Sequence, residues 1–534
     1  MDRRNFLQLS AQAGVAAAIG LRASRGFAQK RKDVVRVLAE GAPNSLDPHG
    51  EGVSRESLGA FTNVYDRLIA FDRKAISPGV YQYDYAKFKG ELAQSYEVVD
   101  GGRALIFHLR PDASFHDGAP VTAEDVRWSL ERGVTLAASK RQLATGSLTD
   151  AQQFKVIDPH TLRIDLPRAD RYALPNLALT FASVLNSKLA LQHATPSDPW
   201  ASAWLRGNAA GGGAFKVSDW QAAQQVTYER FDNWKSGPLP QVRRALFQQV
   251  PTAANRVAAL NRGDADIVVQ LPPRDIDALR HEPQLHVLSI PVTNTFRFIA
   301  FNTQSAPFND VRVRQAIAYA LPYTALFQGA NDGHGTPLYD AASAKPSSAA
   351  FPQPYPYSTQ LAKARALLGA AGLPQGFKTT FSYNVADATV AEPLALLLQE
   401  SLAKIGIQVT IEKIAGAQWG TRQTDKTLPF YVDSSSAWFN EPDYFFRIFF
   451  QGDWRWNFGN FRDEQFGKLV EAARWEPDRR KYDDDIRSAI GVAFEQLPIL
   501  PLWLPSYDIA LQSDLTDFTY YIHGQVDFRP LRRV

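Results

Sequence analysis

The stretch SSSAWFNEPDYFF, residues 434–446, combines residue types that could bind a small organic molecule. Aromatic rings stack on planar or apolar groups, and carboxylates such as Glu441 and Asp443 attract cations. Asn440 and Pro442 interrupt the stretch, so part of it must be a loop. A loop this rich in aromatic side chains is either a buried corner of the fold or the wall of a binding site, and both alternatives are open at this point.

No other group of residues has the spacing of a metal or catalytic site. The nine histidines are scattered, and none forms an HExxH pattern. The glycine-rich GGGAF at 211–215 lacks the Gly-Lys-Ser/Thr of a phosphate loop, and there is no GxSxG elbow. The absence of cysteine excludes disulfides and thiol catalysis. We therefore expect no metal, no cofactor and no enzymatic activity. A secreted hydrolase is the alternative class, and it would need a nucleophile that these patterns do not supply.

The aromatic density continues beyond residue 446. Between Trp438 and Phe461, 11 of 24 residues are Phe, Tyr or Trp, against 12% in the whole chain. Trp438 and Phe439 precede the break in the chain and are predicted to face a ligand. Trp454 and Trp456 alternate around an arginine, so only one of them need face it. Four aromatic residues have helical spacing and are expected to pack inward: Phe445, Phe446, Phe449 and Phe450.

Short-range patterns predict the elements that position these residues. Residues 80–120 and 154–166 show short alternating runs typical of antiparallel strands. VTAEDVRWSLERG predicts a helix that begins with a capping box between Thr122 and Asp125 and ends at Gly133. Strand, helix and strand follow each other within residues 378–412, which indicates a parallel βαβ unit.

The change of pattern along the chain predicts two domains. Antiparallel patterns dominate before about residue 300, and α/β patterns follow it. A second extended run near residue 500 indicates that the chain crosses back to the first domain. Two crossings make a hinge, and the cleft between hinged domains is a common place for a ligand.

The first 28 residues have the composition of an export signal. Arg3 and Arg4 precede an apolar run, and a small-x-small site ends at Ala28. This predicts a signal peptide of the twin-arginine type at 1–28 and a periplasmic location. Its removal takes four arginines and one aspartate, which leaves 58 − 4 = 54 basic and 55 − 1 = 54 acidic residues. A neutral chain gives no reason to expect a nucleic-acid partner.

Segments along the whole chain after the signal resemble the family 5 extracellular solute-binding proteins of ABC importers, which carry peptides, nickel chelates, opines and some sugars. The segment LAQSYEVVDGGRALIFHLRPDASFHDGAPVTAEDVRWSLER, at 92–132, is the most specific of them. The others follow in the order of the family: NSLDPHG at 44–50, NVYDRLIAFD at 63–72, GGGAFKVSDW at 211–220, AALNRGDADI at 258–267, IAFNTQSAPFNDVRVRQAIAYAL at 299–321 and KARALLGAAGLPQGF at 363–377.

The resemblance implies a fold and a role. The fold is α/β and two-lobed, a periplasmic-binding-protein-like fold of the class II type with an extra subdomain. Lobe I would comprise 32–298, with the subdomain at about 73–204; lobe II would comprise 299–504, and 505–534 would return to lobe I. A monomer would capture a small-molecule or peptide-like ligand between the lobes and dock on ABC permease subunits in the inner membrane. A chemoreceptor-partner or chaperone-like role would use the same cleft.

The resemblance also bears on the ligand. In peptide-binding relatives, an aspartate in the loop matching 434–446 pairs with the peptide ammonium, and an arginine before a lobe II helix takes the carboxylate. Trp438 stands where the aspartate would be, and 381–398 contains neither Arg nor Lys. We therefore expect a solute with an aromatic, apolar or quaternary-ammonium part. The alternative is an ordinary oligopeptide or dipeptide whose ammonium is bound by Glu441 or Asp443. The candidate ligand-binding residues are Trp438, Phe439, Asn440, Glu441, Trp456 and Asn44.

Overall fold

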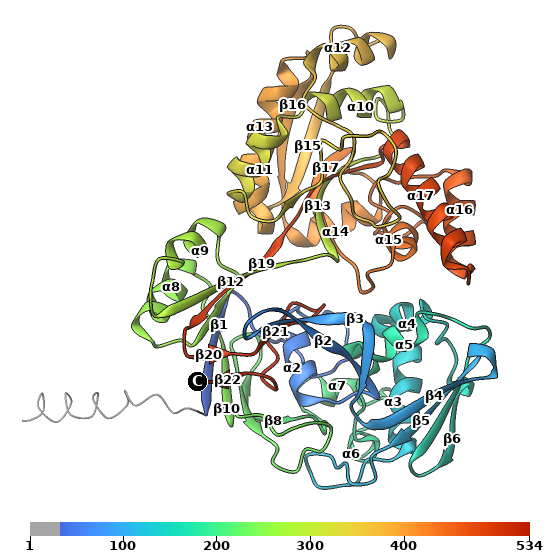
Figure 1. The fold of residues 1–534 in the computed structure, drawn as a ribbon, viewed down its shortest axis with the longest axis vertical. Helices are drawn as coiled ribbons and strands as arrows, with labels where there is room; N and C mark the ends of the chain where they lie inside the picture. Colours follow the sequence, from blue (N-terminus) through green and yellow to red (C-terminus); the bar gives the residue numbers. More distant parts are fainter. Residues whose placement is uncertain (1–32) are drawn as a thin grey trace, which may run out of the picture.

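The computed structural model describes residues 33–534, which form two lobes stacked along the long axis of the molecule (Figure 1). The predicted signal peptide at 1–28 lies outside the described residues. Lobe I is built on a seven-stranded sheet of order β12-β19-β11-β1-β10-β9-β8. Its strands are β1 (Val34–Ala39), β8 (Phe215–Gln221), β9 (Gln225–Arg230), β10 (Arg244–Gln249), β11 (Ile267–Val269), β12 (Leu285–Pro291) and β19 (Ser506–Gln512).

Lobe II is built on a six-stranded sheet of order β14-β18-β13-β17-β15-β16. Its strands are β13 (Thr295–Phe301), β14 (Thr336–Pro337), β15 (Lys378–Asn384), β16 (Gln408–Ile414), β17 (Phe430–Ser436) and β18 (Ile499–Leu504). Its helices are α10 (Val311–Ala320), α11 (Tyr323–Asn331), α12 (Leu361–Ala370), η4 (Val385–Asp387), α13 (Ala388–Ala403), α14 (Gly416–Thr424), α15 (Pro442–Phe449), α16 (Glu464–Trp475) and α17 (Arg479–Gln496). The predicted βαβ unit is confirmed: β15 and β16 pair in parallel, and α13 lies between them in the sequence.

The predicted antiparallel strands of the first half form a small subdomain on lobe I. Its sheet has the order β4-β5-β7-β6, and every pairing in it is antiparallel. The strands are β4 (Ala93–Val99), β5 (Ala104–Leu109), β6 (Phe154–Asp158) and β7 (Thr161–Asp165), and the helices beside them are η1 (Asp100–Gly102), α3 (Ala123–Thr135), α4 (Ala137–Ala144), η2 (Ala151–Gln153), α5 (Ala173–Leu177), η3 (Thr180–Ala182) and α6 (Ser187–Leu191).

The helix predicted at 121–133 begins as expected and ends later. Thr122 and Asp125 form the capping box, with the Thr122 backbone N–H donating to Asp125 Oδ2 at 3.0 Å. The prediction that Gly133 ends the helix was wrong, since α3 continues to Thr135. A Cβ at Gly133 would lie 2.8 Å from Leu143 Cδ1. The glycine is therefore there to let α3 and α4 pack closely.

The remaining elements complete lobe I. A three-stranded sheet, β2-β3-β21, pairs the hairpin near the N-terminus with the C-terminal segment. These strands are β2 (Ile69–Ser77), β3 (Val80–Gly90) and β21 (Phe518–Tyr520); a further pair is β20 (Leu515–Thr516) with β22 (Arg532–Arg533), and the other helices are α2 (Ser57–Val64), α7 (Ser202–Leu205), α8 (Ala253–Arg262) and α9 (Pro273–Leu279). Within residues 33–534 no helix combines the length and the apolar character that crossing a bilayer requires.

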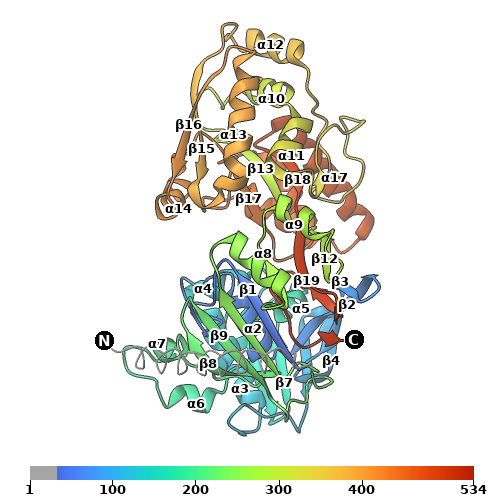
Figure 2. The same cartoon turned by 90° about the vertical axis from the view of Figure 1, so that its left-hand side faces the viewer.

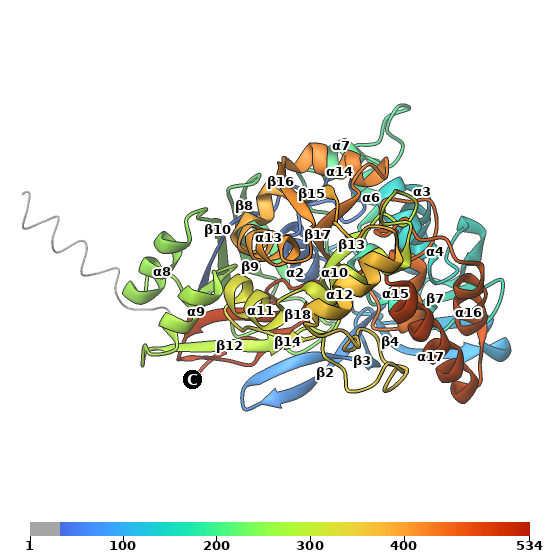
Figure 3. The ribbon, with the colours of Figure 1, turned by 90° about the horizontal axis from the view of Figure 1, so that it is seen from above.

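The chain passes between the lobes at two places. It leaves the lobe I sheet after β12 and enters the lobe II sheet at β13, and it returns between β18 and β19 (Figure 2). The two crossing segments touch each other, because the Val292 N–H donates to the Pro505 carbonyl at 3.3 Å. Away from these crossings, α15, α16 and α17 lie on the subdomain side of lobe II (Figure 3). There the Tyr444 hydroxyl of α15 donates to Gln142 Oε1 of α4 at 3.0 Å.

Candidate ligand-binding cleft

A cavity of about 790 Å³ lies between the two lobes. Its lobe II wall is formed by the end of β17, the loop after it, α15 and the loop after α15. Its lobe I wall is formed by residues 51–55, the helix α4, Phe181 and Ile522. A volume of this size is in the usual range for small-molecule sites, about 300–1,000 Å³.

Tryptophans dominate the lobe II wall of this cavity. Trp438, Trp454 and Trp456 all line it, and Trp456 is 43% exposed. The expectation that only one of Trp454 and Trp456 need face the ligand rested on strand-like alternation. The structure has a loop there, so both rings reach the cavity. Trp454 is held in place by its Nε1–H, which donates to the Ile448 carbonyl at 3.1 Å.

Trp438 is positioned by hydrogen bonds to a crossing segment. The residue before it, Ala437, donates its N–H to the Asn294 carbonyl at 2.7 Å and accepts the Asn294 side-chain amide at 2.8 Å. This carries the indole across to lobe I, where it meets the Phe181 ring edge-on, with ring centroids 5.1 Å apart. Trp438 is half-buried and therefore keeps part of its surface for a ligand.

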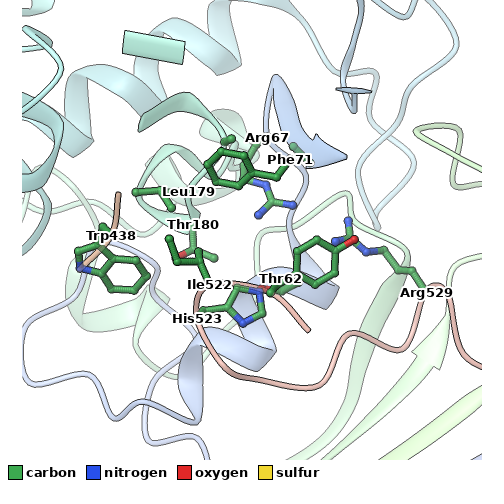
Figure 4. Close-up of a pocket in the computed structure, with 12 residues that line it drawn as sticks. Thr62, Arg67, Phe71, Leu179, Thr180, Trp438, Ile522, His523 and Arg529 are labelled. Atoms are coloured by element: carbon green, nitrogen blue, oxygen red, sulfur yellow. The ribbon is translucent and has the colours of Figure 1, made fainter. Parts of the chain in front are cut away.

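Behind Trp438 lies a second, much smaller cavity of about 10 Å³ (Figure 4). Trp438 stands at one end of it and Arg529 at the other, with Arg67 and His523 between them. Both arginines are paired with carboxylates: each guanidinium bonds Glu91 Oε1 at 2.7 Å, and Arg529 also bonds Asp527 Oδ2 at 2.8 Å. Burial lowers the pKa of His523 to about 3, so its ring is neutral. The space holds at most about one water, so it is too small for a solute.

Phe439 does not line the cleft, which corrects the prediction made from its place before the chain break. Its side chain is fully buried. The ring stacks on Tyr172 of lobe I at 4.9 Å and meets Tyr444 of α15 at 4.8 Å. Both residues lie in a bend after β17, where Trp438 faces the cavity and Phe439 packs into the contact between the lobes. Phe439 therefore fastens the two lobes together.

Asp443 is also turned away from the cleft, against the alternative in which it binds an ammonium. It is fully buried on α15 and does not line the cavity. Its Oδ1 accepts the hydroxyls of Tyr172 at 2.5 Å and Tyr482 at 3.0 Å, and Arg171 Nη2 donates to it at 3.2 Å. Burial, together with the charge of Asp443, raises the pKa of Tyr172 well above its ordinary value, so this phenol is a neutral donor. All three bonds go to Oδ1; Oδ2 is buried without a hydrogen-bond partner and has the Arg447 guanidinium 3.7 Å away. The charge of Asp443 is therefore paired with arginines within the protein.

Glu441 lies beside this network and outside the lining of the cavity. The Tyr482 hydroxyl, whose one hydrogen is shared with the shorter bond to Asp443, lies 3.3 Å from Glu441 Oε2. Burial raises the pKa of Glu441, and the negative charge of Asp443 adds to the effect. Glu441 is therefore a weak candidate for binding a cationic group of a ligand.

The two predicted asparagines do not line the cleft: Asn440 bonds two side-chain hydroxyls, and Asn44 bonds the backbone of a nearby loop. Asn440 donates its side-chain amide to Tyr83 Oη at 2.9 Å and to Thr293 Oγ1 at 3.1 Å. Asn44 donates to the Gly52 carbonyl at 2.9 Å, and its Oδ1 accepts the Ser54 N–H at 2.8 Å. Asn44 thus shapes the loop 44–57, and it is the tip of this loop that reaches the cavity.

Several lining residues were not predicted from the sequence. Arg55 and Arg141 line the cavity from lobe I, and the three serines of SSSAW, residues 434–436, line it from lobe II. The arginines lie outside the aromatic region and have no distinctive spacing, so nothing in the sequence marks them. The serines belong to the stretch that was singled out, and their position just before Trp438 was the available signal.

No metal site accompanies the cleft. Among the side chains of residues 33–534, no group of three or more His, Cys, Asp or Glu is placed to hold a metal ion. The cleft lies between two α/β lobes joined by two crossing segments, and its walls offer stacking surfaces, hydroxyls and charges. That arrangement defines a binding protein that takes a solute between its lobes.

The comparisons with known proteins identify the family. Residues 87–457 match the bacterial extracellular solute-binding proteins, family 5. The chain belongs to this family, whose members are binding proteins, and it is a periplasmic solute-binding component of an ABC transporter. It is 26% identical to the dipeptide-binding protein of Escherichia coli over 86% of this chain and 87% of the other. It is also 26% identical to heme-binding protein A of Haemophilus influenzae, over 82% and 81% of the two chains.

Solved structures show the same two-lobed fold. The binding protein AgaA from A. tumefaciens R10, in complex with agropinic acid, has a TM-score of 0.75 at 25% identity and covers 94% of this chain and 99% of its own. The dipeptide-binding protein from Pseudoalteromonas sp. SM9913, in complex with Met-Leu, has a TM-score of 0.77 at 22% identity and covers 94% of this chain and 100% of its own. The expected fold class is thereby confirmed.

Proposed function

We propose that the cleft captures a small, peptide-like solute with an aromatic or apolar part. The observation that carries this proposal is the wall formed by Trp438, Trp454 and Trp456 in a cavity of about 790 Å³. Covering one indole buries about 150–250 Å², which at about 25 cal/mol per Å² corresponds to about 4–6 kcal/mol before ordering costs. Stacking alone can therefore supply a large part of the roughly 8 kcal/mol that a micromolar affinity needs.

The relatives support a peptide-like or opine-like ligand, and the site favours a particular way of binding it. Named relatives bind a dipeptide, heme and agropinic acid. An ordinary peptide whose ammonium pairs with Asp443 is disfavoured, because that carboxylate is buried and already bonded by Tyr172, Tyr482 and Arg171. A solute with a quaternary ammonium would have only the faces of the indoles to bind its cationic group. One of them, Trp456, already has the Arg455 guanidinium 4.6 Å from its ring centroid.

Native mass spectrometry of protein purified from the periplasm, followed by denaturing release, tests this function. We expect one bound solute per chain, and titration calorimetry with that solute should show at least about tenfold weaker binding to Trp438→Ala. Trp220→Ala is the matched control, since Trp220 is a half-buried tryptophan of β8 that does not line the cleft. Turnover of the solute, or equal binding by both variants, would contradict the proposal.

We further propose that the lobes close on the solute by bending at residues 292–294 and Pro505, and that a monomer docks on the permeases. Small-angle scattering should show a smaller radius of gyration when the solute is added, and light scattering should show one chain per particle. The division into lobe I, lobe II and a C-terminal return is part of this proposal, with the first boundary at 292–294 in place of the expected 298, because β13 (Thr295–Phe301) belongs whole to the lobe II sheet.

Export by the twin-arginine route is proposed from Arg3 and Arg4. Changing both to lysine should leave the protein in the cytoplasm, and cell fractionation would measure this. If the double variant still reached the periplasm, export by this route would be contradicted, and the proposed binding function would be unaffected.

A further inference from the structure

Two arginines line the lobe I side of the cleft, facing a wall without charge. Arg55 precedes α2, and Arg141 lies on α4. Among the ion pairs formed within residues 33–534, neither guanidinium has a carboxylate partner. Glu51 is the single acidic residue among the described residues that line this cavity. The cleft therefore presents two positive charges against one negative charge.

Arg55 stands where the cleft continues toward the crossing segments. It lines both the main cavity and an adjoining cavity of about 250 Å³, which Val292 and Pro505 border. Its charge acts on the tyrosines there: burial raises the pKa of Tyr520 to about 12, and the positive Arg55 opposes that rise. Arg55 can thus reach a ligand group that lies at the junction of the two cavities.

A serine hydroxyl on the opposite wall also lacks a partner. Ser435 is 4% exposed and lines the main cavity, and its Oγ has no hydrogen-bond partner within residues 33–534. A buried polar atom without a partner is rare, because it loses its bonds to water and gains none in return. A solute oxygen that accepts a hydrogen bond from Ser435 would satisfy this atom.

The lobe II wall offers no acidic side chain that would pair with a cation. The residues that it contributes to the lining are serines, aromatic residues, an alanine and an isoleucine. The nearest acidic residues of the segment, Glu441 and Asp443, lie outside the lining, and Asp443 is bonded within the protein. A positively charged solute would face Arg55 and Arg141 with one glutamate as its only counter-charge.

We propose that the solute is an anion: it carries a carboxylate that pairs with Arg55 or Arg141 while its apolar body stacks on the tryptophans. This inference rests on the proposed function and names the charge of the ligand. A guanidinium presents a planar fork of N–H donors that matches the two oxygens of a carboxylate, and such pairs are stronger than neutral hydrogen bonds. A hydrogen bond from Ser435 to an oxygen of the solute would fix its orientation.

Four probes with one apolar core and different end charges test the inference. They are N-acetyl-Phe-Phe, which is anionic; N-acetyl-Phe-Phe-amide, which is neutral; Phe-Phe-amide, which is cationic; and Phe-Phe, which is a zwitterion. Thermal shift and titration calorimetry on the purified full chain should rank the anion first and the cation last. Arg55→Gln or Arg141→Gln should weaken the anion at least about tenfold and leave the neutral amide within about twofold.

Matched variants separate a specific contact from a change of net charge. Lys140→Gln removes one positive charge from α4 at an exposed position outside the lining, and should leave all four affinities unchanged. Glu51→Gln removes the opposing charge and should strengthen binding of the anion by about threefold. Retained binding of the neutral amide also shows that a variant is folded.

The outcomes distinguish this inference from the proposed function. If the cation or the neutral probe binds best, or if both arginine variants bind the anion as the wild type does, the inference is wrong and the binding function stands. If no probe binds and no solute is released from periplasmic protein, both are wrong.

Discussion

The two halves of the segment 434–449 differ in role, although Tyr444, Ile448 and Phe449 of the second half also border the cleft. Ser434 to Trp438 line the cleft, with an indole and a buried hydroxyl left free for a ligand. Phe439 and Asp443 lie in the contact between the lobes, where rings and hydrogen bonds already fill the space around them. The difference shows that an aromatic ring or a carboxylate near a cleft is available to a ligand only where other protein groups do not already pack against it or bond it.

The largest effect is expected on the packed half. Phe439→Ala removes a fully buried ring that contacts Tyr172 and Tyr444, and should lower the free energy of unfolding by about 3–5 kcal/mol. Urea denaturation monitored by tryptophan fluorescence measures this. Unchanged stability with a loss of ligand affinity would place Phe439 in the binding site and abolish the distinction between the halves.

The next effect concerns the buried carboxylate. Asp443→Asn removes the charge that Tyr172, Tyr482 and Arg171 bond, and should cost about 1.5–3 kcal/mol of stability. Tyr172→Phe should give part of the same loss, and the double variant should lose less than the sum because both changes remove one hydrogen bond. If Asp443→Asn instead abolished solute binding in a protein of normal stability, the carboxylate would have to face the ligand.

Substitution in the cleft half should lower ligand affinity more than it lowers stability. Trp438→Ala should weaken the solute at least about tenfold, which is about 1.4 kcal/mol, with a smaller loss of stability than Phe439→Ala. Calorimetry and urea denaturation on the same two variants give a direct comparison. Equal losses of stability in both variants would show that the indole is a packing residue.

A smaller, pH-dependent effect is expected at a third contact between the lobes. His334 of lobe II bonds Asp508 at 2.8 Å through Nδ1 and Asp277 at 3.1 Å through Nε2. Burial alone would lower the pKa of His334, but these two carboxylates raise it above 6.5. Because the folded-state pKa is raised, the contact stabilises the protein fully below pH 6.5, and the stabilisation is lost as the pH rises through the folded-state value.

Urea midpoints at pH 6 and pH 9 measure this contribution. The wild type should lose more stability over that interval than His334→Gln, and His281→Gln, at an exposed position, should behave as the wild type does. The same pH dependence in all three proteins would remove His334 from the contact between the lobes.

The sequence predicted the parts of the fold that depend on local patterns. The capping box of Thr122 and the parallel pairing of β15 and β16 follow from spacing within a few residues, and both are confirmed. Gly133 was misjudged because its role depends on Leu143 of the next helix, a contact that helix signals alone do not reveal.

The sequence predicted only those residues of the site that lie together in one segment of the chain. Trp438 and Trp456 lie within the aromatic region and line the cavity. Asp443 was open to a binding role because its partners, Tyr172 and Arg171, are about 270 residues away in sequence. Arg141 was missed for the same reason, since α4 and the tryptophans meet only when the lobes are assembled.

A crystal structure of the protein with the solute that it carries from the periplasm tests the account most directly. We predict density between the tryptophans of lobe II and the arginines of lobe I, with Asp443 still bonded to Tyr172 and Tyr482. A solute bound by Asp443, or one bound outside the space between Trp438 and α4, would contradict the account.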